Sequence, residues 1–392
     1  MWFGALVPAC FQPVYEGTAC SADGACPAGL RCRLDLNVCT RGAISDAAIV
    51  SIDGGVFGDA GVDAMGSSDA QSCFGSLPRV CFTTPPTASI FISSNSALDT
   101  SNSPMCNPNH DQADKYCVIA GTSFVISTAA TLRASGAKPL VLISTSAMFD
   151  LSGSIDVSSH AGTLVGAGGN SEDCVVGSAA TMDSGGAGGS FGGKGGDGKT
   201  IDGMGGIAAA AMTTFPTKLR GGCQGGAGAG DPRGVGGNGG GAVEIVASKV
   251  VMGGQINASG AGGHGGGSTK CGGGGGGSGG MIVIDSPAIS LIGTAAVFAN
   301  GGGGAQGGET GGGHEGADGG EALAPLIAAV GGKTAGLGGG GGGNGAAGPG
   351  SKDGDTAVNA PSSNGGGGGG GGASGFIRAP AAGSTLISPT PE

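Results

Sequence analysis

Large aromatic side chains are scarce in this sequence. Its 392 residues include one Trp, two Tyr and 12 Phe, so a conventional core packed around aromatic rings is not expected. No run of 18 consecutive apolar residues occurs, and the sequence therefore predicts no membrane-spanning helix. Basic residues number 17 against 28 acidic ones, a net charge of −11 that repels phosphate backbones, so no nucleic-acid partner is expected.

Histidine is also rare, with four residues in the whole chain. None of them stands at a metal-ligand spacing from another, which argues against a zinc site. We expect isolated surface imidazoles at all four positions, His110, His160, His264 and His314.

Glycine is what the chain has in excess. It supplies 95 residues, and each loses more backbone entropy on folding than any other residue type. Only a fold with a repeated backbone scaffold could recover that loss. The apolar residues are mostly Ala, Val, Ile and Leu, which suit narrow stacked strands.

The 12 cysteines indicate an oxidising compartment. Four of them follow the spacing C-x5-C-x5-C-x6-C, which is typical of a small loop-rich unit with two disulfides, whereas zinc sites need C-x2-C pairs that are absent here. These four are Cys20, Cys26, Cys32 and Cys39.

The later cysteines predict further disulfides. Cys73 with Cys81, and Cys106 with Cys117, are close enough in sequence to pair. Cys174, Cys223 and Cys271 lie in glycine-rich sequence, and a pair among them would restrain it. If Cys10 is lipidated, one cysteine is left over, and we expect it to be Cys271.

Cys10 follows a short apolar stretch, residues 2–9, that looks like the end of a bacterial lipoprotein signal. We therefore predict that residues 1–9 are the remnant of an export signal and that Cys10 is the lipidation candidate. The alternative is a Cys10 disulfide in an exported chain. Residues 10–39 would form the disulfide unit, and residues 40–72, rich in Ala, Asp, Ser and Gly, a flexible acidic linker.

From residue 73 to 392 short β-branched runs recur in sets of three, which predicts an all-β fold, a parallel β-helix or solenoid. Alternate residues of each run are apolar and would point inward. The inward positions align as Val141 and Ile143 with Val243, Ile245, Ile282 and Ile284; as Phe149 and Leu151 with Val250, Met252, Ile289 and Leu291; and as Ile155 and Val157 with Ile256, Ala258, Ala295 and Val297.

Two more segments extend this pattern. A looser coil precedes the three, because Leu132 lies 23 residues before Ile155, a plausible length for one uninterrupted turn. Residues 376–380 are expected to cap the stack.

Glycine-rich insertions separate the repeats at residues 161–241, 260–280 and 299–375. They follow the third run of successive coils, so they would share one edge of the solenoid, where insertions commonly form a binding face. A three-residue period, as in residues 185–190, predicts packed extended left-handed helices. Plain disorder is the alternative.

Catalytic motifs occur only as products of glycine abundance. Residues 193–200 fit a phosphate-loop expression, but glycine follows where a helix should begin. Residues 276–280 fit G-x-S-x-G without a strand-to-helix turn. A calcium site would have to use scattered acids, Asp231, Glu315, Asp318, Asp353 and Asp355.

Cys10, the unit from Cys20 to Cys32, the Asp/Ala-rich tether and the glycine-rich repeats together resemble uncharacterised surface lipoproteins of myxobacteria and their relatives. The likeness to the mycobacterial PE-PGRS family is one of composition alone, and no PE domain is present. The resemblance brings no catalytic residues, and it implies a lipid-anchored protein at the cell surface.

We therefore expect a non-catalytic structural or adhesive protein, extracellular or at the cell surface, whose contact with a membrane is a lipid anchor. Its partners would be extracellular glycans or other surface components, and no cofactor is expected. The alternatives are an extracellular polysaccharide lyase or hydrolase on a β-helix, which would need clustered acidic and basic residues, and a calcium-binding repeat module.

Overall fold

The computed structural model describes residues 72–379 except 147, 163, 201–202, 335–337 and 349, and the backbone of three short strands outside that range. The chain forms two compact units, residues 1–66 and 67–392. In the first unit β1 (Arg31–Arg33) and β2 (Val38–Thr40) form an antiparallel pair. The rest of it, with Cys10, the side chains of Cys20, Cys26, Cys32 and Cys39, and the linker, lies outside the described residues.

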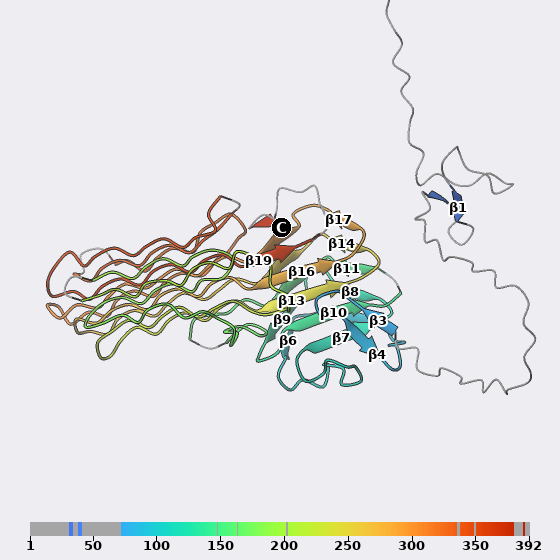
Figure 1. Ribbon diagram of the computed structural model, residues 1–392, viewed down its shortest axis with the longest axis horizontal. Helices are drawn as coiled ribbons and strands as arrows, with labels where there is room; N and C mark the ends of the chain where they lie inside the picture. The colour runs from blue at the N-terminus through green and yellow to red at the C-terminus, as the bar shows by residue number, and fades with distance from the viewer. Residues whose placement is uncertain are drawn as a thin grey trace, which may run out of the picture. The chain divides into compact units, whose positions relative to one another are not determined.

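The second unit is all-β in its described part. Three parallel sheets are stacked strand by strand in chain order, an arrangement compatible with the predicted β-helix (Figure 1). The first sheet contains β7 (Cys117–Gly121), β10 (Leu140–Ser144), β13 (Ala242–Val246), β16 (Met281–Asp285) and β19 (Phe376–Arg378). The second contains β5 (Ile90–Ile92), β8 (Phe124–Ile126), β11 (Phe149–Leu151), β14 (Val250–Met252) and β17 (Ile289–Leu291). The third contains β6 (Ser96–Asp99), β9 (Thr131–Ser135), β12 (Ser154–Asp156), β15 (Gln255–Asn257), β18 (Ala296–Phe298) and β20 (Ile387–Ser388). We call these sheets together the strand stack.

The predicted register is confirmed in the second sheet. Phe149 pairs with Val250, and Val250 with Ile289. In the third sheet Ile155 pairs with Leu132, so the looser coil is also confirmed. Residues 376–378 form β19, the last strand of the first sheet, which pairs with β16.

Two register predictions are wrong. In the first sheet Leu140 and Leu142 pair with Val243 and Ile245, so Val141 lies opposite Glu244. Every residue of β10 is apolar up to Ser144, so the alternation of apolar and polar residues cannot show which of its side chains point inward. In the third sheet Ile256 pairs with Val297, two residues beyond the predicted partner, because β18 begins after a longer turn.

The first sheet is buried on both faces, which explains the continuous apolar sequence of its strands. Its inner face joins the core of the stack, where Phe124 and Phe149 lie parallel with ring centroids 4.7 Å apart. Its outer face carries a second apolar cluster. That cluster is covered by the antiparallel hairpin β3 (Ser72–Phe74) and β4 (Val80–Phe82), whose strands are joined by the Cys73–Cys81 disulfide.

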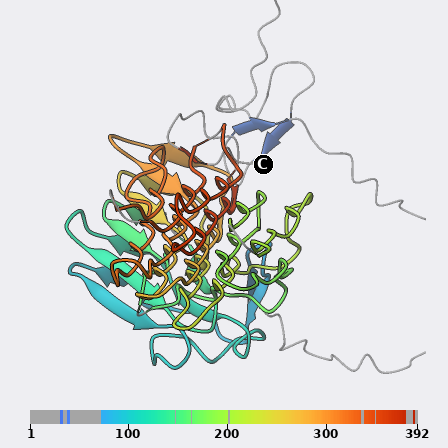
Figure 2. The ribbon, with the colours of Figure 1, turned by 90° about the vertical axis from the view of Figure 1, so that its left-hand side faces the viewer.

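Three glycine-rich segments leave the stack after β12, β15 and β18 and return at β13, β16 and β19. We call residues 157–241, 258–280 and 299–375 together the glycine bundle. All three emerge from the third sheet and re-enter the first, and they run side by side away from the stack (Figures 1 and 2). Because each segment leaves after the third strand of its coil, all three lie at the same edge of the strand stack, as predicted.

The glycine bundle is hydrogen-bonded with a three-residue period. In residues 272–280, N–H groups three apart donate to the same neighbouring segment, and the three phases address three different neighbours. The carbonyls of the same stretch accept from three further segments. Around its middle the bonds run from Gly275 to Gly226, Gly276 to Gly370 and Gly277 to Ala261, and from Gly237, Gly189 and Gly302 back to those three residues.

Six neighbours around one segment define hexagonal packing of chains with three residues per turn, the repeat of a polyproline-II-type helix. Hydrogen bonds between the segments therefore replace the hydrogen bonds between strands of a β-sheet. They satisfy backbone N–H and C=O groups that would otherwise be buried without partners. This result favours ordered extended helices over the disorder alternative. The close approach explains the glycine: a Cβ on Gly276 would overlap the carbonyl oxygen of Gly302.

Candidate functional site

The segment that fits a phosphate-loop expression, residues 193–200, is part of the glycine bundle. Its N–H groups donate to different neighbouring segments, Gly196 to Gly371 and Gly198 to Gly206, instead of converging on one point. Lys194 forms an ion pair with Asp197 at 3.1 Å. This geometry does not cradle a phosphate.

Ser278, the serine of the G-x-S-x-G match, is fully buried inside the bundle. Its Oγ accepts the N–H of Cys223 at 2.7 Å and donates to the carbonyl of Gly279. The hydroxyl therefore links two bundle segments and has no access to a substrate.

Three of the five acids considered for calcium join segments of the bundle. Asp318 accepts the N–H of Gly265, Asp353 that of Lys194, and Asp355 the side-chain N–H of Asn344. Within residues 72–379 as described, no group of three His, Cys, Asp or Glu side chains is arranged to hold a metal ion. Each of these three carboxylates accepts its hydrogen bond at a different place in the bundle.

The prediction of isolated surface imidazoles is wrong for three of the four histidines. His264 lies 3.6 Å from Asp318, and His110 packs edge-on against the ring of Phe82.

The third, His160, makes the most contacts. Its Nδ1 lies 2.7 Å from Glu321 Oε2, and its Nε2 lies 3.2 Å from Ser158 Oγ and 3.6 Å from Asp156. Arg133 on β9 pairs with Asp156 at 2.9 Å. Because Arg133 and Asp156 lie in strands, whereas His160 and Glu321 belong to the first and third segments of the glycine bundle, this cluster ties the bundle to the strand stack.

Ser158, His160 and Glu321 reproduce the order of contacts in a serine–histidine–acid triad, but not its electrostatics. Hydrogen bonds to Asp156 and Glu321 raise the pKa of His160 to about 9, so the ring is protonated at neutral pH and cannot accept a proton. Ser158 is buried and donates its hydroxyl proton to Asp156. The cluster acts as an ionic clamp.

Replacing His160 by glutamine is expected to cost about 1 kcal/mol at pH 6, the range of a partly exposed charge pair. A raised pKa means that the folded state holds a proton which the unfolded state releases above pH 6.5. The contribution of His160 to the free energy of unfolding is therefore complete below pH 6.5, and it is lost as the pH rises through 9. Urea unfolding from pH 6 to 10 should show a difference that shrinks with pH, and a constant difference would contradict the clamp.

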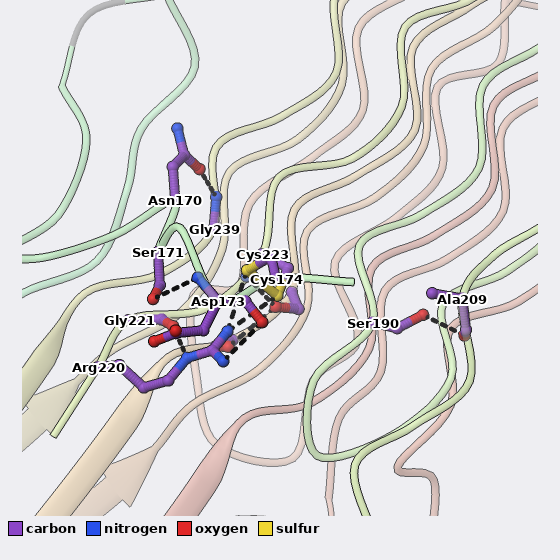
Figure 3. The surroundings of a disulfide bond; sticks show 12 residues. Asn170, Ser171, Asp173, Cys174, Ser190, Ala209, Arg220, Gly221, Cys223 and Gly239 are labelled. Atoms are coloured by element: carbon purple, nitrogen blue, oxygen red, sulfur yellow. Dashed lines mark hydrogen bonds between the residues drawn. A yellow bond between two sulfur atoms is a disulfide. The ribbon is translucent and has the colours of Figure 1, made fainter. Parts of the chain in front are cut away.

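A groove of about 550 Å³ opens between the loop at residues 170–180 and two bundle segments, 187–190 and 223–228. The Cys174–Cys223 disulfide fixes the loop to the bundle (Figure 3). Arg220 donates to the carbonyl of Asp173 at 3.1 Å and stacks on Phe191, with its guanidinium carbon 4.7 Å from the ring centroid. The loop wall is therefore held rigidly.

The state of two further sets of cysteines agrees with the prediction from the sequence. Cys106 is bonded to Cys117, and Cys271 is a free, buried thiol. The pairing of Cys174 with Cys223 leaves Cys271 as the odd cysteine of the three in the insertions.

Large exposed apolar side chains gather on the glycine bundle. The bundle carries most of those in the described part of the chain, and their exposed fractions reach 87% at Val176 and 85% at Leu323. Four of them, Leu323, Leu326, Ile327 and Val330, lie within eight residues of sequence, and clustered exposed apolar side chains mark interaction sites. The bundle members are Leu164, Val175, Val176, Met182, Met204, Ile207, Val235, Leu323, Leu326, Ile327, Val330 and Val358.

No helix in the described part of the chain is long and apolar enough to cross a membrane. Comparisons of the sequence with protein-family models and with curated proteins, and of the fold with solved structures, give no match.

Proposed function

We propose that this chain is a non-catalytic structural or adhesive protein of the cell exterior, in which a β-solenoid supports a glycine bundle that makes the contacts. The observation that carries the proposal is the display of apolar side chains along a bundle whose segments are joined to one another by backbone hydrogen bonds. A rigid projection with an apolar surface suits attachment to another macromolecule.

The disulfides at Cys73–Cys81, Cys106–Cys117 and Cys174–Cys223 support an extracellular location, since such bonds persist in oxidising compartments. Lipidation at Cys10 would add the membrane anchor. The exposed apolar side chains of the bundle favour a protein component of the cell surface as partner, with extracellular glycans as the alternative.

Adhesion is tested with the full chain, labelled and incubated with isolated cell-envelope material. Changing Val176 and Leu323 to aspartate together is expected to reduce retention about tenfold, because both side chains lie on the bundle surface. The control is Phe91→Asp, which places one such charge on an exposed residue of the strand stack. Equal retention of all variants would contradict the proposal, and release of reducing sugar from envelope polysaccharide would favour the enzyme alternative.

A further inference from the structure

The groove beside the Cys174–Cys223 disulfide contains backbone N–H groups that the bundle leaves unused. Ala187 and Ser190 lie on one wall, and Gln224 and Ala227 on the other. Within the described part of the chain the N–H groups of these four residues donate no hydrogen bond. Ala187 and Ser190 are buried, and buried backbone donors rarely lack a partner in folded proteins.

The four donors share the three-residue phase of the bundle. On the first wall, Gly186 and Gly189 donate to one neighbour and Gly185 and Gly188 to another, so residues 187 and 190 form the remaining phase. On the second wall the remaining phase is 224 and 227, because the other two phases already donate to neighbouring segments. Each wall thus presents two donors one turn apart, about 9 Å in a polyproline-II-type helix.

The loop at residues 170–180 explains why no segment of this chain meets these donors. Gly221 donates to the carbonyl of Gly168, and Ser178 donates to that of Ile207, so the chain lies against the bundle before and after the loop. Between those two contacts it forms the outer wall of the groove. The groove therefore continues the hexagonal packing at a position bounded by bundle segments.

We propose that this groove binds an extended glycine-rich segment of a partner polypeptide, packed as one more three-residue helix of the bundle. Carbonyl oxygens of the segment, repeating every third residue, would accept from the four N–H groups. This is the counterpart of adding a strand to a sheet edge. This proposal rests on the proposed surface function only for the class of partner. The groove and its four donors follow from the hydrogen bonds of the bundle alone.

Small residues are required of the ligand on the sides that face the walls, because the walls are themselves backbone. Glu172 and Arg233 also line the groove and offer charges to the polar groups of the segment. A glycine-rich chain with occasional alanine, the composition of the bundle itself, fits these conditions.

The experiment measures binding of a labelled peptide of four Gly-Gly-Ala repeats to the full chain by fluorescence anisotropy. Ala227→Pro removes one groove donor, and its fixed φ suits a polyproline-II-type segment. We expect it to weaken peptide binding at least tenfold. Ala328→Pro is the matched control, since that exposed alanine lies in the third insertion, away from the groove, and its N–H also donates no hydrogen bond.

Amide hydrogen exchange gives a second readout that does not depend on any variant. Exchange at Ala187, Ser190, Gln224 and Ala227 should slow when the peptide is added. Absence of binding up to 1 mM peptide, or equal binding by the wild type and Ala227→Pro, would overturn the proposal. Envelope retention that fails while the peptide still binds would count against the adhesive function alone.

Discussion

Replacing Gly276 by alanine is expected to lower the melting temperature of the full chain by about 5 °C or more, the effect of roughly 3 kcal/mol in a domain of this size. A Cβ at this position would overlap the carbonyl oxygen of Gly302 in the neighbouring segment. Relief requires the two segments to separate, which breaks hydrogen bonds at the centre of the hexagonal packing. Circular dichroism melting measures the shift.

The matched control is Gly341→Ala, a substitution of the same kind within the same bundle. There the nearest heavy atom to a new Cβ lies 3.7 Å away, at the Lys333 side chain, which is ordinary van der Waals contact. We expect a change of less than 1 °C, since the smaller backbone entropy of the unfolded chain favours alanine slightly. Similar melting temperatures for both variants would show that close backbone packing does not hold the bundle together.

Glu244 is expected to make the protein less stable as the pH rises. This carboxyl on β13 is fully buried on the outer face of the first sheet, and its Oε1 accepts the N–H of Leu77 at 3.0 Å. Burial raises its pKa to about 8, with the nearby charge of Asp285 adding to the effect and Arg378 opposing it. The folded protein therefore keeps a proton that the unfolded chain has released.

The sign follows from linkage. Because its pKa is raised, Glu244 makes a contribution to the free energy of unfolding that is complete below pH 4.5 and is lost as the pH rises through 8. The total loss is of the order of 4 kcal/mol. Glu244→Gln keeps the acceptor for Leu77 without the charge, so it should match the wild type at pH 4.5 and be clearly more stable at pH 8.5. Parallel denaturation curves of both proteins across this range would refute the assignment.

Strand alternation predicted the second sheet and most of the third because those strands have one apolar and one polar face. In the first sheet it predicted the pairing of Val243 with Ile282 but failed between β10 and β13, because β10 is apolar on both faces. The missing information was the hairpin β3–β4, which covers the outer face and comes from residues 72–82, far away in sequence. It also gives Glu244 its buried environment, so an outward-facing glutamate became a buried carboxyl.

The glycine bundle was foreseen through its three-residue period, but its neighbours were not, since hydrogen bonds between segments up to about 180 residues apart leave no local trace. The His160 clamp was missed for the same reason. Glu321 lies 161 residues from His160, and nothing near either residue signals the pairing. The groove depends on a register between segments that only the assembled bundle defines.

The measurement that tests this account most directly is amide hydrogen exchange over residues 272–280 of the full chain. The hexagonal packing predicts strong protection at every N–H of this stretch, because each donates to one of three neighbouring segments. A β-sheet edge would instead protect alternate residues. Rapid exchange throughout the stretch would contradict the bundle and, with it, the projecting surface on which the proposed function depends.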